Sequence, residues 1–201
     1  MENLFTIKDL VEEIASNQDM AIAIHSKCRV LSFDKNENAD KETYVLKMAN
    51  TKGHTISVWF NFETKDTAIA YNGDSAEEAL AKDQTAKLKH LINLVIAMGL
   101  QKTLLSLDEA PNFVRDFMTL RGIILDNKMG NYFNLKVIAN GAGNPKISKS
   151  GWKCYEKWEE GKEPTLTYTA DEKNKINNLS MNTNSPIINA DGEGGLGSFL
   201  V

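Results

Sequence analysis

The sequence contains few of the residues from which disulfide scaffolds and metal centres are built. Two cysteines and three histidines occur in 201 residues, scattered along the chain. We therefore expect reduced thiols at Cys28 and Cys154, as in a reducing compartment. We expect no metal site at His25, His54 or His90. His25 and Cys28 are three apart in a predicted strand, where alternation sends their side chains to opposite faces.

Long apolar runs are missing as well. No window approaches the roughly 20 apolar residues that a membrane-spanning helix needs. The first ten residues, MENLFTIKDL, have neither the basic region nor the apolar stretch of a secretory signal. These absences predict a cytoplasmic protein (host cytoplasm if the protein is viral) that does not contact membrane.

Motifs that carry catalysis are also lacking. No Ser-His-Asp or Cys-His arrangement can be argued from the spacing, and the acidic pairs lie in helix starts or polar loops. The loop NGAGNPK at 140–146 lacks the G-x-x-x-x-G-K-[ST] pattern of a phosphate-binding loop. We therefore predict a protein without enzymatic activity and without a cofactor.

One run of the sequence departs from the composition of the rest. The chain is 42% hydrophobic with a net charge of −4, enough apolar residues for the core of a domain. Residues 127–158 instead hold six lysines and one acid, Glu156, interleaved with two tryptophans, two tyrosines and a phenylalanine. Lysines attract phosphates, and aromatic faces stack on unpaired bases. The alternative is an ordinary hairpin with solvated lysines and a core of aromatics.

Hydrophobic periodicity divides the chain into helices and strands. Helix spacing and caps such as Ser75 with Glu78 predict helices at 6–17, from 75 to Gly99, at 111–120 and at 169–179, and Asp83 could begin a separate helix. Alternation predicts strands at 20–33, 43–50, 54–62, 123–125, 131–139 and 152–158, and suggests short ones at 67–71 and 164–169.

Three strands, a helical connection and further strands are the chain order of an OB barrel, a fold that binds oligonucleotides. We therefore predict an α+β fold: an OB-like antiparallel β-barrel with an N-terminal helix and a helical insert, about 75–121, between strands 3 and 4. The barrel would form one domain over 1–179, and the glycine- and asparagine-rich residues 180–201 would be a disordered tail. The alternative is a generic α+β domain with an antiparallel sheet and helices on one side.

Counting alternate residues along the strands gives one face that mixes cations with aromatics. Trp152 and Trp158 share the parity of Cys154, so we expect them in the core, with Tyr155 on the exposed side. The residues predicted to bind nucleic acid are Lys27, Arg29, Trp59, Tyr132, Lys136, Lys146, Lys149, Lys153, Tyr155 and Lys157. A β-bulge in any strand would reverse part of this assignment.

The chain resembles phage single-stranded DNA-binding proteins. The resemblance rests on its size, its strand order, its basic and aromatic face, and a tail with Asp191 and Glu193 before the apolar end Phe199, Leu200 and Val201. More narrowly, it is similar in style to a conserved replication-module protein of crAss-like gut phages. The resemblance implies sequence-tolerant binding of single-stranded DNA in phage DNA replication or recombination, and recruitment of replication proteins by the tail.

Two further points stay open from the sequence. RNA is an alternative ligand, and the sequence also allows the protein to form a homo-oligomer. The competing function is a non-enzymatic protein-binding adaptor or a structural component of a virion, in which the lysines only solvate a β-surface.

Overall fold

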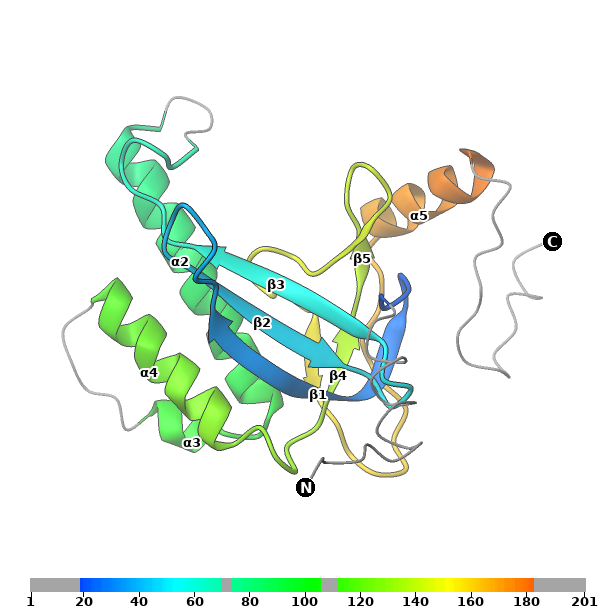
Figure 1. Ribbon diagram of the computed structural model, residues 1–201. Helices are drawn as coiled ribbons and strands as arrows, with labels where there is room; N and C mark the ends of the chain where they lie inside the picture. Colours follow the sequence, from blue (N-terminus) through cyan, green and yellow to red (C-terminus); the bar gives the residue numbers. More distant parts are fainter. Residues whose placement is uncertain (1–18, 70–73, 106–111, 183–201) are drawn as a thin grey trace, which may run out of the picture.

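The computed structural model describes residues 19–69, 74–105 and 112–182 (Figure 1). The predicted helix at 6–17 and the apolar end Phe199–Val201 lie outside the described residues. None of the helices in the described part of the chain is both long and apolar enough to cross a membrane.

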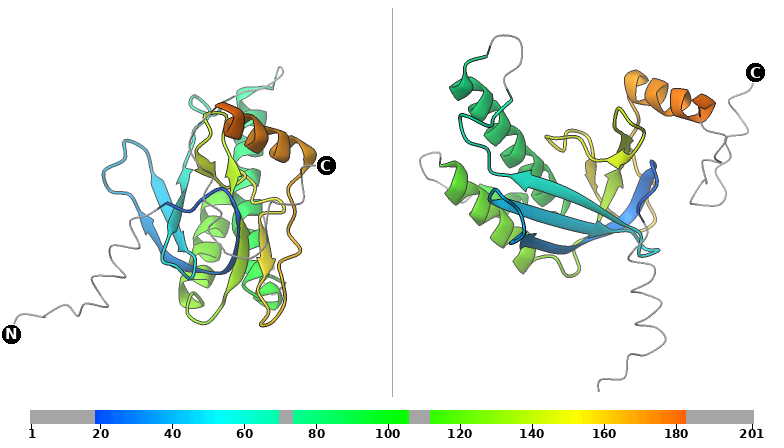
Figure 2. Two further views of the ribbon diagram at one scale, coloured as in Figure 1. Left: turned by 90° about the vertical axis from the view of Figure 1, so that its right-hand side faces the viewer. Right: turned by 45° about the horizontal axis from the view of Figure 1, so that its top comes forward.

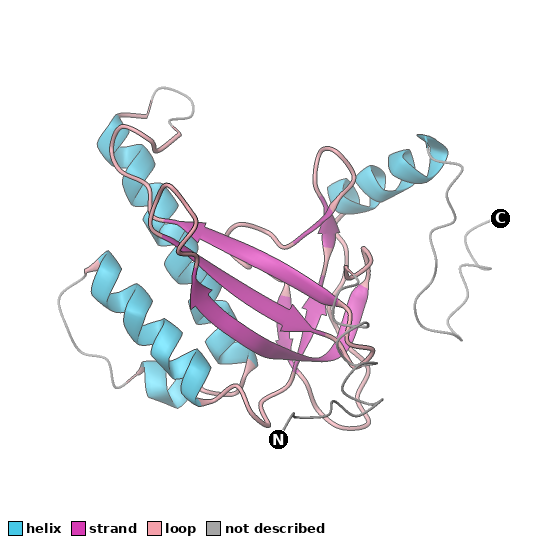
Figure 3. Cartoon of the chain, in the orientation of Figure 1, coloured by secondary structure: helices cyan, strands magenta, loops and turns pink. Residues whose placement is uncertain are grey.

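The predicted α+β class is confirmed, with an antiparallel sheet of five strands (Figure 3). The strand order is β3-β2-β1-β4-β7, and a two-stranded ribbon, β5 with β6, is separate. The strand bounds are β1 Ile24–Lys35, β2 Thr43–Ala49, β3 Thr55–Asn61, β4 Phe133–Lys136, β5 Ile138–Ala139, β6 Pro145–Lys146 and β7 Tyr155–Lys157. Among these strands β3 and β7 are the two edges and do not pair, so the sheet is not closed into a barrel.

β1 is the central strand and has two different partners along its length. Its second half pairs with β2, while Ile24, His25 and Cys28 pair with β4. The register shifts between His25 and Cys28, and Lys27 has a φ of 53° there, so an extra residue is accommodated as a bulge. As a result His25 is buried and Ser26 is exposed. The predicted faces of β1 before the bulge are therefore wrong, because the extra residue reverses the alternation.

Helices α2 (Ala76–Ala97), α3 (Gln101–Leu104) and α4 (Phe113–Asp126) form the predicted insert. The two long helices, α2 and α4, pack against each other and lie on one side of the sheet (Figure 2). The capping box of Ser75 and Glu78 is confirmed, and α2 runs through Asp83 without a break. The helix ends at Ala97 with Met98 as its C-cap, and Gly99 follows with a φ of 80°, a conformation that favours glycine.

The predicted strand at 123–125 is wrong, because α4 continues through Gly122 to Asp126. Phe117, Leu120 and Ile124 are the buried residues of α4, at spacings of three and four. This spacing lets one helical face cover the sheet. Gly122 in the middle of the helix costs only about 1 kcal/mol relative to alanine, and the packing of its neighbours offsets that cost.

The core between these helices and the sheet is rich in phenylalanine. The Phe117 ring lies 5.7, 5.3 and 5.5 Å from the rings of Phe33, Tyr44 and Phe60. Cys28 and Cys154 are free and buried, as predicted, and burial raises the pKa of Cys28 to about 12.

The C-terminal segment crosses the outer side of β4, the side away from α2 and α4. Residues 164–169 do not form the suggested strand, and α5 (Ala170–Asn182) follows them. Residues 180–182 are therefore helical rather than part of a disordered tail. Thr169 and Glu172 cap α5 as predicted, and the Tyr168 hydroxyl donates a hydrogen bond to the Val137 carbonyl at 2.9 Å.

Candidate nucleic-acid interface

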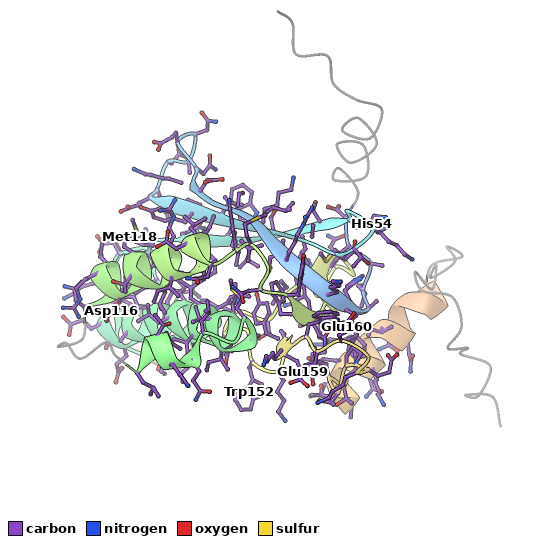
Figure 4. The ribbon with its side chains drawn as sticks, turned by 90° about the horizontal axis from the view of Figure 1, so that it is seen from below. His54, Asp116, Met118, Trp152, Glu159 and Glu160 are labelled. Carbon is purple, nitrogen blue, oxygen red and sulfur yellow. The ribbon has the colours of Figure 1, made fainter. Side chains whose placement is uncertain are left out.

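None of the three tryptophans lies in the core. Trp59 is 58% exposed, Trp152 is 66% exposed and Trp158 is partly buried. The expectation that Trp152 and Trp158 are core residues is therefore wrong. Trp152 lies in a turn before β7 and projects from the surface (Figure 4). Tryptophan and tyrosine are enriched at binding interfaces, because each combines an apolar ring with a polar group.

Lys27, Tyr132 and Trp158 form a compact group, here named the bulge cluster. Lys27 Nζ is 4.6 Å from the centroid of the Trp158 ring and 5.2 Å from that of Tyr132. The two rings meet edge to face at 5.7 Å. A lysine amine over an aromatic ring is a cation–π contact, and this one leaves both a charge and aromatic surface at the protein exterior.

The bulge positions Lys27 in this cluster. Asn134 Oδ1 accepts hydrogen bonds from the Ser26 hydroxyl at 3.1 Å and from the backbone N–H of Lys27 at 3.4 Å. The Asn134 amide donates to Glu156 Oε2 at 2.8 Å. The amide of Asn134 therefore links the bulge in β1 to β7 and fixes the backbone from which the Lys27 side chain starts.

A hollow of about 270 Å³ opens beside the cluster. Besides Lys27 and Trp158, it is lined by His25, Ser26, Asn50, Thr51 and Lys52. This lining is polar and carries two lysines, which suits an anionic ligand with hydrogen-bonding groups. The Asn50 amide is itself held by a hydrogen bond to His25 Nδ1 at 3.3 Å.

The exposed side of β7 is the reverse of the predicted one. Tyr155 pairs with Leu135 and shares its buried side, while Glu156 pairs with Asn134 on the outer side. The Tyr155 ring packs on Phe133, and its hydroxyl lies 2.5 Å from His90 Nε2. Burial raises the pKa of Tyr155 well above its usual value. The prediction of an exposed, stacking Tyr155 is therefore wrong.

Lys136 has the predicted orientation, on the outer side of β4, but it is not exposed. Its side chain is 1% exposed. Its Nζ bonds to the Thr167 carbonyl at 3.1 Å and to Glu172 Oε2 at 3.0 Å. The C-terminal segment covers β4 at this point, so the prediction of a solvent-facing Lys136 is wrong and the lysine anchors that segment.

A second aromatic and cationic pair lies beside α2. Lys153 Nζ is 5.5 Å from the Trp152 ring, in a turn where Lys153 itself has a φ of 51°. The neighbouring Lys149 pairs with Asp83 of α2 at 2.7 Å, and Lys87 bonds to the same carboxylate. Burial raises the pKa of Asp83, but hydrogen bonds from Lys149 and Lys87 and their charges outweigh it, so the pKa is lowered.

The remaining predicted residues are exposed but dispersed. Arg29 and Lys146 lie on β1 and β6, and Trp59 faces solvent on β3 opposite Val45. The Lys157 side chain runs beside Gly99, at the C-terminal end of α2. A cation there stabilises the negative end of the helix dipole, which explains Lys157 without a ligand.

The structure therefore brings together Lys27 and Tyr132 from the predicted set, and Lys149 with Lys153 at a separate place. Prediction from sequence missed Trp158, Trp152 and the lysines of α2 beside Trp152. The alternation of lysine and aromatic residues drew attention to residues 127–158, but the side on which each side chain lies depended on strand register. Among the described residues no group of three His, Cys, Asp or Glu side chains could hold a metal ion.

Comparison with known proteins assigns no family to this chain. No protein-family model matches it, and a search of curated proteins gave no match.

Proposed function

We propose that this protein binds single-stranded DNA without sequence preference, by stacking bases on surface tryptophans that lysines flank. One observation carries the proposal: all three tryptophans are outside the core, and two of them have a lysine amine over the ring. A base stacked on an aromatic side chain contributes roughly 1–3 kcal/mol, and every base offers such a face.

The strand connectivity supports an OB-like architecture. In an OB fold the first strand pairs with the second and the fourth, and the fourth pairs with the fifth. Here β1 pairs with β2 and β4, and β4 pairs with β7. The helices between β3 and β4 occupy the place of the OB connection. We propose that the sheet is an OB-like barrel left open between β3 and β7, which agrees with its oligonucleotide-binding role.

The setting of this activity follows from the resemblance to phage single-stranded DNA-binding proteins. That resemblance would place the protein in phage DNA replication or recombination. Replication proteins would then be partners of the tail that ends in Phe199–Val201.

The decisive experiment is a titration of labelled oligo(dT) followed by anisotropy, at salt concentrations between about 50 and 200 mM. Affinity should fall with a log–log slope of about 0.7 per phosphate that a lysine neutralises. Trp158→Leu should weaken binding about tenfold, given the energy of one stacked base. Lys27→Gln should lower the salt slope by about 0.7. Failure of the wild-type protein to bind oligo(dT) at low salt overturns the proposal.

A matched control is Lys102→Gln on α3. Lys102 is exposed and has no ion-pair partner among the described residues. Lys102→Gln removes one positive charge from the protein, as Lys27→Gln does, but at a position away from the bulge cluster. Equal losses in both variants would mean that net charge, rather than the cluster, determines binding. Competition by oligo(U) gives the preference between DNA and RNA.

A protein-binding adaptor remains a second candidate because of one feature of α4. Val114 and Met118 lie one helical turn apart and are 53% and 39% exposed. Apolar pairs at this spacing are typical of helix-docking surfaces. A defined oligomer in light scattering that Val114→Glu with Met118→Glu abolishes, in a protein that does not bind oligo(dT), would favour this candidate.

A further inference from the structure

We propose that the groove between α2 and Trp152 is a second nucleotide site, which takes one base and one adjoining phosphate of the same single strand. This inference rests on the proposed function. The groove has a volume of about 540 Å³ and is lined by Lys82, Thr85, Lys89, Ser150 and Trp152, with Ala81 and Ala86. Its size falls in the range of small-molecule sites, and we name it the α2 groove.

Trp152 is held in place by the residues on either side of it. The Ser150 carbonyl accepts a hydrogen bond from the Asn93 amide of α2 at 3.1 Å. The backbone N–H of Cys154, a fully buried residue, donates to the Gly151 carbonyl at 3.1 Å. The turn is therefore hydrogen-bonded to α2 before Trp152 and leads into the core after it, and its backbone carries the exposed Trp152 indole. A stacking platform needs this fixed position, because a mobile ring would lose entropy on binding.

The α2 side of the groove presents three small side chains and two lysines. Ala81, Thr85 and Ala86 line it with Lys82 and Lys89, while Ser150 lies in the turn that carries Trp152. The small residues leave space beside the Trp152 ring for a flat group of the size of a base. Thr85 and Ser150 also offer two hydroxyl groups for the hydrogen-bonding edge of that base.

The charges around the α2 groove determine where a phosphate fits. Lys89 and Lys153 are exposed and have no ion-pair partner among the described residues. The carboxylates on the other side are neutralised within the protein, Asp74 by Lys82 and Asp83 by Lys149. The uncompensated positive charge therefore lies beside Trp152, where the phosphate next to a stacked base would be.

Binding at this groove should depend on the length of the strand. One stacked base and two solvated lysines bind a free mononucleotide weakly. Trp152 and Trp158 flank β7 at its two ends, so a strand held at the bulge cluster raises the effective concentration of its next nucleotides at the α2 groove. We expect longer oligonucleotides to occupy both the bulge cluster and the α2 groove, and shorter ones to occupy only one of these sites.

The test uses the full chain with Trp59→Phe and Trp158→Phe, which keeps an aromatic ring for stacking at both positions and leaves Trp152 as its single tryptophan. Its fluorescence should be quenched by oligo(dT) above a threshold length and little changed by dTMP. In the wild-type background, Lys89→Gln with Lys153→Gln should weaken binding of the longer oligonucleotides about tenfold and lower the salt slope by about 1.4, for two lysines. Lys102→Gln again serves as the control for charge.

The outcomes separate this inference from the proposed function. If the wild-type protein binds oligo(dT) and Trp158→Leu weakens it, but Trp152 is not quenched and the double lysine variant binds normally, the α2 groove is not a site and the proposed function stands. If the wild-type protein binds no oligonucleotide, both fail. Trp152→Leu checks the stacking itself, and its high exposure means that it should leave the fold intact.

Discussion

Lys136 Nζ lies 3.0 Å from Glu172 Oε2, in a contact that joins β4 to the first turn of α5. The lysine is buried, and among the described residues the partners of its charge are Glu172, the Thr167 carbonyl and the Tyr168 ring, all in the C-terminal segment. The segment from 164 to 172 is therefore part of the domain. This segment covers the outer side of β4, all four residues of β4 are buried, and Tyr132 just before the strand is partly exposed.

Glu172→Gln should destabilise the protein by about 2 kcal/mol, because it leaves the charge of Lys136 buried without a counter-ion. Burial raises the pKa of Glu172, but hydrogen bonds from Thr169 and Lys136 outweigh it and lower the pKa, so the Glu172 carboxylate is ionised at neutral pH. Urea denaturation at pH 7 measures the loss. The double variant Lys136→Met with Glu172→Gln should recover most of it, since no charge then stays buried. A double variant as unstable as the single one would contradict this account.

Acid should destabilise the fold through His90. Burial lowers the pKa of His90 to about 4, against 6.5 in the unfolded chain. The unfolded state therefore takes up a proton first as pH falls below 6.5, and up to about 3 kcal/mol of stability is lost by pH 4. The midpoint of urea denaturation, measured at intervals from pH 7 to pH 4, should fall as this stability is lost.

The matched variant for this prediction is His90→Phe with Tyr155→Phe. His90 Nδ1 donates to the Lys149 carbonyl at 3.2 Å, so Nε2 accepts from the Tyr155 hydroxyl, and the double variant removes both partners of that bond. Stability should depend less on pH between 6.5 and 4 in the variant than in the wild type. The same slope in both proteins would assign the acid sensitivity to other groups.

Gly151→Ala should cost more stability than Gly130→Ala. Both glycines have positive φ, 64° and 81°, so an alanine is strained at either position by about 1 kcal/mol. At Gly151 a Cβ would also lie 3.0 Å from the Tyr155 ring and 3.2 Å from the backbone of His90, whereas at Gly130 it meets nothing within 4 Å. The difference in unfolding free energy between the two variants measures the cost of the close contact between the added Cβ at position 151 and its neighbours. Equal costs would show that the loop moves away freely.

Asn134→Ala should weaken the proposed binding of single-stranded DNA although Asn134 is buried. Its amide fixes the bulge that carries Lys27, so its loss should reduce affinity several-fold and stability by about 2 kcal/mol. Oligo(dT) titration and urea denaturation together measure both effects. A stability loss without any change in affinity would mean that the bulge does not position Lys27 for binding.

Much of the local structure could be predicted from the sequence. The hairpin of β2 and β3 follows from alternating residues such as Leu46 and Met48, because one face of a strand must be buried. Ser75 and Thr169 begin helices because their side chains accept hydrogen bonds from backbone N–H groups three residues later. These signals act within a few residues, so they can be recognised without the fold.

The candidate site could be predicted only as a region. Several lysines and aromatics from 127 to 158 reach the surface, but Lys136 is buried, and Tyr155 and Trp158 lie on the opposite sides from those predicted. Alternation shows that these two residues face different sides of β7. It does not show which side the core occupies, because that depends on the pairing of Tyr155 with Leu135.

The sequence by itself therefore determined α2, α5, the first part of α4, most of the strands and the concentration of cations with aromatics in one stretch. Only the tertiary structure decided which of those side chains reach solvent. The bulge at Lys27, the register of β7 and the cover over Lys136 each depend on residues about 20 to 110 positions away. Local pattern fixes which side chains share a face, whereas exposure depends on what the rest of the chain packs against that face.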